Sequence, residues 1–424
     1  MKPKIAVVDT NYPLEKHCGM AASWLKYELA KRNISETPIG EADILLITTT
    51  SQEALAQVRG RLKRAKNKNV VKILGGGGCT APAIYEDYAD AICVGEGKNF
   101  MDVLLKCGLE AAKELPETWV KGESRAVVPS QVFPWEMPPI MYPDGYVRLF
   151  LSRGCKYKCL FCQTGWERHY IPCADSGEFI RRLAKIRSQS VPYAIVTNDG
   201  GEEIPYLKAG QQFISIRFDG LKKIPQLNRR MVKGVRIGVE GVSERLRIAV
   251  GKKVDNDELI NHTINLLNKS VQVQWFFVLG LPGEIAADYE ELKYLVNGIK
   301  RFAEKGAVLA NFHAFIPQPA APLCIFPLVD EYWEMFKEFK EWFFGGLGKT
   351  SRFLMVSPGQ YAGRLRRAQN SMCAQEDELR RGWWQADNKN WRVKYVLPPA
   401  GLRKAASIYA AKIGMASDLK PDAK

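Results

Sequence analysis

The 424-residue sequence predicts an α/β protein with two successive regions of parallel strands and a mixed or helical C-terminal extension. Short apolar runs of strand length alternate with helical patterns from residue 4 to about residue 315, as parallel sheets require. Glycine-rich turns follow several of these runs, where the ligands of such sheets bind. We expect four parts: an open doubly wound sheet, a proline-rich linker, a partial (β/α)6 barrel and the extension, over residues 1–107, 108–145, 146–330 and 331–424.

Composition indicates a cytoplasmic protein. No apolar run approaches the ~20 residues of a membrane span. The chain opens with Met1-Lys2-Pro3-Lys4 and lacks the pattern of a signal peptide. We therefore interpret the ten cysteines as reduced thiols or metal ligands rather than disulfides.

The positive charge is concentrated near the C-terminus. The net charge is +15, and residues 351–424 contain 14 Lys and Arg against 6 Asp and Glu. Aromatic rings alternate with cations there, at Trp383, Trp384, Trp391 and Tyr395 among Arg380, Arg381, Lys389, Arg392 and Lys394. Rings can stack on bases while cations hold phosphates, so we expect a nucleic-acid partner. The alternative is a core of aromatics with a solvated basic face.

The first region contains alternating strands and helices with glycine turns. Expected strands cover residues 4–9, 43–48, 70–74 and 91–94, and expected helices cover 19–32, 54–66 and 98–107. A further strand is hard to find around Glu36–Ile39. The four glycines from Gly75 to Gly78 allow a large ligand to approach the backbone closely.

Leu151–Cys162, LSRGCKYKCLFC, opens the second region and contains three cysteines. Cys155, Cys159 and Cys162 have the spacing C-x3-C-x2-C. Three thiolates in one loop suit three irons of a [4Fe–4S] cube and leave the fourth iron open. The alternative is half of a zinc site, completed by Cys173 or His169.

Polar or glycine-rich turns follow the later strands of this region. The expected strands cover residues 146–151, 193–197, 213–218, 235–240, 273–279 and 307–315. The strand at 193–197 leads into Gly200-Gly201-Glu202, and the strand at 213–218 has Ser215 and Arg217 on one face near its end. The strand at 235–240 ends in Glu240, before GVSERLR. The strand at 273–279 leads into Gly280-Leu281-Pro282-Gly283-Glu284. About six strand–helix units predict a partial barrel whose site lies at the carboxyl ends of its strands.

In this order, the three cysteines with Phe161, GGE, SERLR and GLPGE resemble the motifs of the radical S-adenosylmethionine (SAM) superfamily. The resemblance implies that Cys155, Cys159 and Cys162 hold a [4Fe–4S] cluster. It implies that SAM binds the open iron and is cleaved to a 5′-deoxyadenosyl radical. The cofactor-binding residues it implies are Phe161, Gly200, Gly201, Glu202, Ser215, Arg217, Glu240, Gly280 and Pro282. Arg217 and Glu240 are also candidate catalytic residues, and for Arg217 an ion pair with Asp219 is the alternative.

The first region resembles the flavodoxin/Rossmann-like cobalamin-binding domain that precedes many radical SAM domains, through GGGGCTAPA and VGEG. Cobalamin is therefore a possible cofactor, although the D-x-H-x-x-G motif is absent. More distantly, Cys79 resembles a ligand of the auxiliary cluster of methylthiotransferases. Thr49 or Thr50 stands where those enzymes have cysteine, so sulfur insertion ranks lower. The alternative for this region is a docking module that binds no cofactor.

We therefore expect a radical SAM enzyme that modifies a base of tRNA or DNA by rearrangement or C–C bond formation at an attached group. Cobalamin-dependent radical methylation is one alternative, and action on a peptide or small metabolite is another. A catalytically inactive binding module is disfavoured by the intact motifs. The resemblance also implies an external electron donor such as flavodoxin or ferredoxin.

Overall fold

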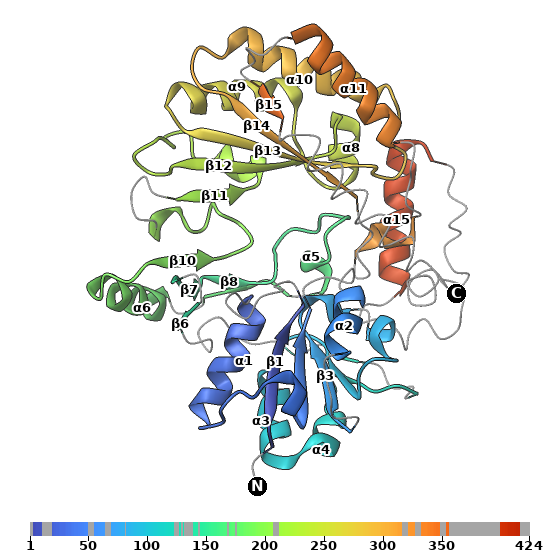
Figure 1. Cartoon of the computed structure of the whole chain (residues 1–424). Helices are drawn as coiled ribbons and strands as arrows, with labels where there is room; N and C mark the ends of the chain where they lie inside the picture. The colour runs from blue at the N-terminus through green and yellow to red at the C-terminus, as the bar shows by residue number, and fades with distance from the viewer. Residues whose placement is uncertain are drawn as a thin grey trace. The chain divides into compact units, whose positions relative to one another are not determined.

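The computed structural model forms two compact units, which are described separately (Figure 1). Unit 1 comprises residues 1–154, 166–196 and 368–399, and unit 2 comprises 155–165, 197–367 and 400–424. Structure is described for residues 3–10, 19–49, 55–63, 69–80, 82–122, 127–128, 130, 139–142, 145–167, 169–173, 176–206, 212–315, 321–326, 332–347, 353–355 and 399–415. The tryptophan-rich segment predicted to bind nucleic acid lies outside these residues.

A five-stranded sheet forms the centre of unit 1. Its order is β1-β2-β3-β4-β5, parallel except for the last pair. The strands are β1 (Ile5–Asp9), β2 (Ile44–Thr48), β3 (Val71–Gly75), β4 (Ala91–Cys93) and β5 (Thr118–Trp119). The strand that is hard to find around Glu36 is reduced to a single parallel bridge from Glu36 to Ile5. This bridge lies on the free side of β1, so a segment between β1 and β2 in the chain pairs outside β1, as in doubly wound sheets.

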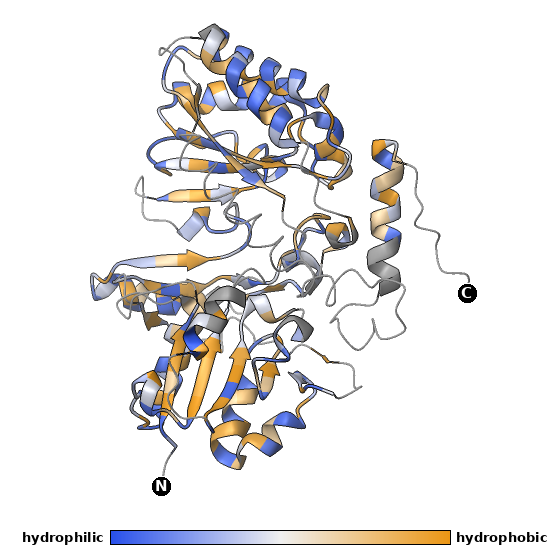
Figure 2. Ribbon diagram, turned by 45° about the vertical axis from the view of Figure 1, so that its right-hand side comes forward, coloured by the Kyte–Doolittle hydropathy of each residue, from blue (hydrophilic) through white to orange (hydrophobic). Residues whose placement is uncertain are grey.

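The residues of this sheet are apolar on both faces because helices cover it. Its strands are orange along most of their length in Figure 2, and Ile5, Leu46 and Ile73 are buried in one core. The helices are α1 (Met20–Lys31), α2 (Leu55–Leu62), α3 (Lys98–Cys107) and α4 (Leu109–Lys113), with 3-10 turns at Ile39–Glu41, Gly77–Thr80 and Pro82–Tyr85. Both α4 and β5 lie in the segment predicted as a linker, so the sheet extends past residue 107.

The glycine run after β3 packs against the protein's own backbone. Gly76 has φ +101°, and a Cβ there would lie 2.4 Å from the carbonyl oxygen of Thr49. The N–H of Gly78 donates to the same oxygen at 3.0 Å. Gly76 is therefore required by the close approach of two turns, whatever ligand the site takes.

The rest of unit 1 contains the first two parallel strands of the predicted barrel. The sheet order is β10-β7-β6, in which β10 and β7 are parallel. The elements are β6 (Ile140–Met141), β7 (Val147–Phe150), β10 (Tyr193–Val196), the pair β8 (Ser152–Arg153) and β9 (Ile171–Pro172), and α6 (Ser176–Ser188). Helix α5 (Thr164–Glu167) follows the cysteine loop at the boundary of the units.

Unit 2 is built on a five-stranded parallel sheet of order β11-β12-β13-β14-β15. Its strands are β11 (Phe213–Ile216), β12 (Gly234–Glu240), β13 (Gln272–Leu279), β14 (Val308–Ala314) and β15 (Phe353–Met355). Its helices are α7 (Phe218–Leu221), α8 (Glu244–Ala249), α9 (Asn256–Asn268), α10 (Asp288–Phe302), α11 (Tyr332–Leu347) and α15 (Pro399–Ile413), with 3-10 turns at Ile204–Tyr206 and Pro322–Ile325. Alternate residues of β13 are fully buried in one core cluster, including Val273, Trp275 and Phe277.

The six parallel strands expected of the partial barrel are all present, as β7, β10, β11, β12, β13 and β14. The predicted α/β class is confirmed. The predicted domain boundaries stay a prediction. Among the described residues, no helix combines the length and the apolar character that a membrane crossing requires.

Candidate active site

The three cysteines lie in a short loop of unit 2 that is held by backbone hydrogen bonds. The N–H of Leu160 donates to the carbonyl of Val250 at 3.1 Å, and the carbonyl of Leu160 accepts from Leu323 at 3.1 Å. Cys159 is buried, whereas Cys155 and Cys162 are half-buried. Burial is the largest influence on Cys155 and Cys159 and raises the pKa of both thiols. The loop is therefore anchored on both sides before it binds anything.

Arg217, at the end of β11, contacts this loop directly. Its Nη1 donates to Sγ of Cys159 at 2.9 Å, and Nη2 donates to the carbonyl of Gly251 at 3.2 Å. Its Nε donates to Asp219 at 2.9 Å. The guanidinium lies 4.0 Å from the centre of the Tyr157 ring. The ion pair with Asp219 is thus present, and binding of SAM by Arg217 stays a prediction.

The Gly200-Gly201-Glu202 turn is joined to the cysteine loop through Asp199. Tyr157 donates its hydroxyl hydrogen to Asp199 at 2.9 Å, and Lys156 lies 2.9 Å from the same carboxylate. Burial acts to raise the pKa of Asp199, but hydrogen bonds from Lys156, Gly201 and Tyr157 outweigh it and hold that pKa below its usual range. The carboxylate is therefore a charged link between the two loops.

Within this turn, the glycines are required by a close approach to β11. The N–H of Gly200 donates to the carbonyl of Ser215 at 2.7 Å, and a Cβ on Gly200 would lie 2.4 Å from that oxygen. Glu202 accepts from Lys156 at 3.0 Å and from Thr197 at 3.0 Å. The side chain of Ser215 is exposed. Roles for these residues in binding SAM stay predictions.

Glu240 ends β12 in an unusual backbone conformation. Its φ is +73°, and the register with β13 shifts between Gly238 and Glu240. Non-glycine residues with positive φ are strained, and such strain often marks a functional position. The carboxylate pairs with Lys252, whose Nζ also donates to the carbonyl of Gly238 at 2.9 Å. A Cβ on Gly238 would lie 2.6 Å from that Nζ, so glycine leaves room for the ion pair.

Lys252 connects Glu240 with the cysteine loop. Its Nζ lies 5.8 Å from the centre of the half-buried Phe161 ring, the aromatic before the third cysteine. The Lys252 side chain is 7% exposed, so its charge acts in a poorly hydrated environment. Two cations, Arg217 and Lys252, therefore lie near the thiols, and both act to lower the pKa of Cys159 against the effect of burial.

The Gly280–Glu284 turn is fixed by contacts to other elements of unit 2. Gly280 has φ +75°, and a Cβ there would lie 2.5 Å from the Tyr332 ring. Its N–H donates to Glu284 at 3.0 Å, and the carbonyl of Pro282 accepts from Tyr409 at 2.8 Å. Binding of SAM by Gly280 and Pro282 stays a prediction.

SERLR supports that turn. Ser243 caps α8 and donates its hydroxyl hydrogen to Asp288 at 2.6 Å. Arg245 pairs with Asp288 at 2.6 Å and donates to the carbonyl of Gly283 at 2.9 Å. Arg247 is fully buried and donates to the carbonyl of Val254 at 3.0 Å. The motif therefore acts structurally, by fastening α8 to the Gly280–Glu284 turn.

The loop chemistry fits an iron–sulfur cluster better than a single metal ion. Among the described residues, which include Cys173 and His169, no three His, Cys, Asp or Glu side chains gather as they would around one ion. This finding gives the zinc alternative no support. In a [4Fe–4S] cube each thiolate binds a different iron, so its three cysteines need not converge on one point. Thiolates are the ligands such clusters take, and nearby Arg217 and Lys252 offset their negative charge.

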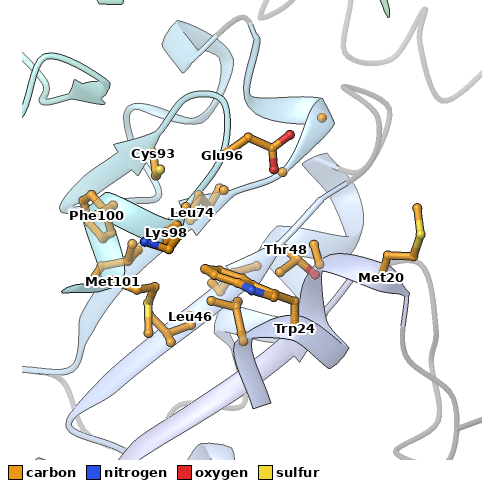
Figure 3. A pocket seen from close by; sticks show the side chains of 18 of the residues that line it. Met20, Trp24, Leu46, Thr48, Leu74, Cys93, Glu96, Lys98, Phe100 and Met101 are labelled. Atoms are coloured by element: carbon orange, nitrogen blue, oxygen red, sulfur yellow. The ribbon is translucent and has the colours of Figure 1, made fainter. Parts of the chain in front are cut away.

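Unit 1 contains a separate cavity of ≈ 260 Å³ at the carboxyl ends of β2, β3 and β4 (Figure 3). Trp24 of α1 points into it, and Thr48, Gly75 and Cys93 line it at the strand ends. Most of the lining is apolar, and Glu96 pairs with Arg153 at one side. Cys79 is buried in the 3-10 turn after β3. The cavity lies where doubly wound sheets bind ligands.

Sequence reasoning missed several residues of the candidate site. Neither the contact of Lys252 with Glu240 nor the links of Tyr157 and Lys156 to Asp199 were predicted. Gly251, with φ +89°, turns the chain so that Lys252 points back toward Glu240. A glycine followed by lysine after a short helix is a weak signal for such a contact.

The chain was compared with known protein families and with curated proteins of similar sequence. No family model matches the chain. It is 27% identical over 299 residues to a tRNA-2-methylthio-N(6)-dimethylallyladenosine synthase of Cellvibrio japonicus, covering 61% of this chain and 64% of that protein. It is 25% identical over 328 residues to the synthase of the same name from Aromatoleum aromaticum, covering 66% and 69%. The chain thus spans less than two thirds of the length of the first of these relatives.

Solved structures resemble the chain in fold. The radical SAM methyltransferase TsrM of Kitasatospora setae, with cobalamin and a [4Fe-4S] cluster bound, aligns with a TM-score of 0.57 and 13% identity over 77% of both chains. The cobalamin-dependent SAM radical enzyme OxsB aligns with a TM-score of 0.50 and 16% identity, over 69% of this chain and 51% of that chain. These likenesses confirm, at the level of the fold, the resemblance to radical SAM proteins predicted from the motifs.

Proposed function

We propose that this chain, which resembles radical SAM enzymes in sequence and fold, is itself a radical SAM enzyme that modifies a base of a nucleic acid. One observation carries the proposal. The cysteine loop and the Gly200–Glu202 turn are joined in unit 2 by Tyr157 and Lys156, which contact Asp199 and Glu202. Arg217 contacts the same loop at Cys159 and Tyr157. This arrangement brings the candidate cluster ligands and the candidate SAM-binding turn to the same end of the sheet.

The chain's own residues have distinct roles in this proposal. Cys155, Cys159 and Cys162 would hold a [4Fe–4S] cluster, which when bound supplies the electron that cleaves SAM to a 5′-deoxyadenosyl radical. The Gly200 turn presents backbone groups beside the loop, where the amino group of SAM would be accommodated. The Glu240 carboxylate, oriented by Lys252, would accept a hydrogen bond from the ribose of SAM or from the substrate. The reaction would be a rearrangement or C–C bond formation at a group attached to the base.

The nucleic-acid substrate is supported by charge and by the relatives. The net charge of +15 favours a polyanionic partner. The relatives named above are synthases of a modified tRNA nucleoside. We further propose an external electron donor such as flavodoxin or ferredoxin. A peptide or small-metabolite substrate is the alternative, and it predicts no salt-dependent binding of tRNA or DNA.

The enzyme class is tested by anaerobic reconstitution with iron and sulfide. The wild-type chain should bind about four irons and form 5′-deoxyadenosine from SAM with dithionite. Cys159→Ala should lose the cluster absorption and the product. Cys107→Ala is the matched control because Cys107 is exposed on α3. Product formation by Cys159→Ala equal to the wild type would refute the cluster assignment.

Cobalamin-dependent methylation is the second candidate, and the cavity in unit 1 supports it. The cavity is apolar and lies at the ends of three parallel strands. Cobalamin, when bound, would supply a methyl group for transfer to the substrate. Purification with hydroxocobalamin and a visible spectrum tests this candidate. A chain that retains no corrin absorption but still cleaves SAM would leave base modification without methyl transfer as the surviving proposal.

A further inference from the structure

The sheet of unit 2 has a second candidate functional surface at the amino ends of its strands, opposite its glycine-rich turns. Three turns lead into β12, β13 and β14, over residues 222–233, 269–271 and 303–307. Because these strands are parallel neighbours, their amino ends lie at one edge. Two bonds join the first two turns: Gln272 N–H to Lys233 carbonyl at 3.2 Å, and Lys269 Nζ to Pro225 carbonyl at 2.9 Å. The first two turns are therefore joined, and the third lies beside the second because β14 pairs with β13.

Cations dominate this surface, which we name the basic edge. It consists of Arg229, Arg230, Lys233, Lys269, Lys300, Arg301 and Lys305. Most of these side chains are exposed, and Lys269 and Lys300 are half-buried. Glu304 is the one acidic residue in the three turns. At the opposite end of the same sheet, Arg217, Arg245 and Lys252 each pair with a carboxylate, of Asp219, Asp288 and Glu240 respectively. The cations there are balanced by acids, whereas the three turns contain a single acid.

Helix dipoles explain only part of this charge. Cations are favoured at the C-terminal ends of helices, where Lys269, Lys300 and Arg301 lie. Arg230 and Lys233 lie in the turn before β12, and Lys305 lies beyond the end of α10. These three side chains lie outside the helices, so the helix dipole does not account for them, and Lys233 lies 5.7 Å from the centre of the Phe213 ring.

Ion pairs among the described residues leave three cations of the edge without an acidic partner. Within the described part of the chain, no carboxylate ion-pairs with Arg230, Lys233 or Lys305. The guanidinium of Arg301 lies over the ring of Phe302 at 5.2 Å, and that ring is 54% exposed. An exposed aromatic beside a guanidinium can stack on a base while the cation contacts a phosphate. The edge therefore offers both kinds of contact that nucleic acids use.

We propose that the basic edge binds the sugar–phosphate backbone of the nucleic acid at nucleotides remote from the modified base. This inference rests on the proposed nucleic-acid substrate. β13 has eight residues, which at about 3.3 Å each separate the two ends of the sheet by roughly 25 Å. This length corresponds to about seven base pairs at ~3.4 Å per pair. The edge would thus add affinity without reading sequence, because phosphate contacts position a nucleic acid and base contacts specify it.

The test compares two triple charge reversals in the full chain. The edge variant is Arg230→Glu, Lys233→Glu and Lys305→Glu. The control variant is Lys106→Glu, Arg181→Glu and Lys337→Glu, which changes net charge equally at exposed sites elsewhere. Fluorescence anisotropy would measure binding of a labelled tRNA transcript and of a labelled 30-base-pair DNA duplex at several salt concentrations.

For the preferred nucleic acid, the edge variant should bind on the order of 10- to 100-fold more weakly, and its plot of log K against log[salt] should flatten by about 2 to 3. The control should match the wild type. Equal affinities and slopes in all three proteins would overturn the inference. Normal nucleic-acid binding with impaired reduction by flavodoxin would also overturn it, because the edge would then dock an acidic protein. If the wild-type chain binds neither probe, the proposed nucleic-acid substrate is refuted, independently of the basic edge. Unchanged SAM cleavage by the edge variant shows that the variant is folded.

Discussion

Arg217 donates a hydrogen bond from Nη1 to Sγ of Cys159 at 2.9 Å, although 58 residues separate the two in sequence. Asp219 holds the same guanidinium through Nε at 2.9 Å. The Arg217 side chain is 12% exposed, so water screens its charge only weakly. A cation at this position stabilises the electron-rich form of any cluster bound by Cys159. Hydrogen bonds to cluster sulfurs and local charge are established determinants of reduction potential.

We therefore predict that Arg217→Gln lowers the midpoint potential of the reconstituted cluster. The expected shift is on the order of 59 mV, which is a tenfold change in a one-electron equilibrium. Asp219→Asn should shift the potential upward, because it leaves the cation without its counter-ion. Potentiometric titration followed by electron paramagnetic resonance measures both changes. Lys222→Gln is the control, since Lys222 pairs with Glu258 at the surface. Identical potentials in Arg217→Gln and wild type would contradict the prediction.

Asp288 should be important for the stability of unit 2. Its side chain is 5% exposed and accepts from Ser243 at 2.6 Å, Arg245 at 2.6 Å and the Ile285 N–H at 2.8 Å. Asp288→Ala leaves these donors without an acceptor and should lower the free energy of unfolding by about 3 kcal/mol. Denaturant unfolding measures the loss.

The matched control for that change is Asp257→Ala. Asp257 is an exposed acid in the first turn of α9 and should cost less than about 1 kcal/mol. Equal losses in the two variants would show that the Asp288 network adds little to stability.

Glu284 should make stability depend on pH. Burial is the largest influence and raises its pKa from 4.5 to about 7, even though Tyr289 and the Gly280 N–H donate to it. The folded chain therefore binds a proton that the unfolded chain releases between these values. This contribution is complete below about pH 4.5 and is lost as pH rises through about 7. Its size is about 3 kcal/mol.

Glu284→Gln removes this titration and keeps a hydrogen-bonding side chain. As pH rises from 4.5 to 8, the unfolding free energy of the wild type should fall relative to that of the variant. Denaturant midpoints across this range provide the measurement. Parallel curves for the two proteins would mean that Glu284 is ionised in the folded state near pH 5.

Ala21→Trp should test whether cobalamin binds in the cavity of unit 1. Ala21 lies on α1, lines the cavity of unit 1 and is only half-buried, so a larger side chain can enter the cavity without disrupting the core. If the cavity holds part of cobalamin, the variant should retain at least tenfold less corrin, while its iron content stays at the wild-type level. The visible spectrum and iron analysis report the two quantities separately. Undiminished corrin binding would show that cobalamin does not use this cavity.

The sequence by itself determined the elements and the positions of the site residues along them. The helix expected at residues 98–107 has those bounds, because apolar residues at helical spacing and flanking glycines specify it locally. Gly200, Arg217 and Glu240 could be assigned to strand ends for the same reason. Parallel strands must have their carboxyl ends at one edge, so these residues were expected in one region.

Only the tertiary structure decided which side chains meet. The pairing of Arg217 with Cys159, of Lys252 with Glu240 and of Tyr157 with Asp199 depends on strand register and on loops anchored far apart in sequence. The same holds for Gly76, whose glycine is required by the Thr49 carbonyl rather than by a ligand. The basic edge also required the fold, because it combines cations from three turns that become neighbours only when β12, β13 and β14 pair. Local patterns specify the elements, and long-range packing determines the contacts.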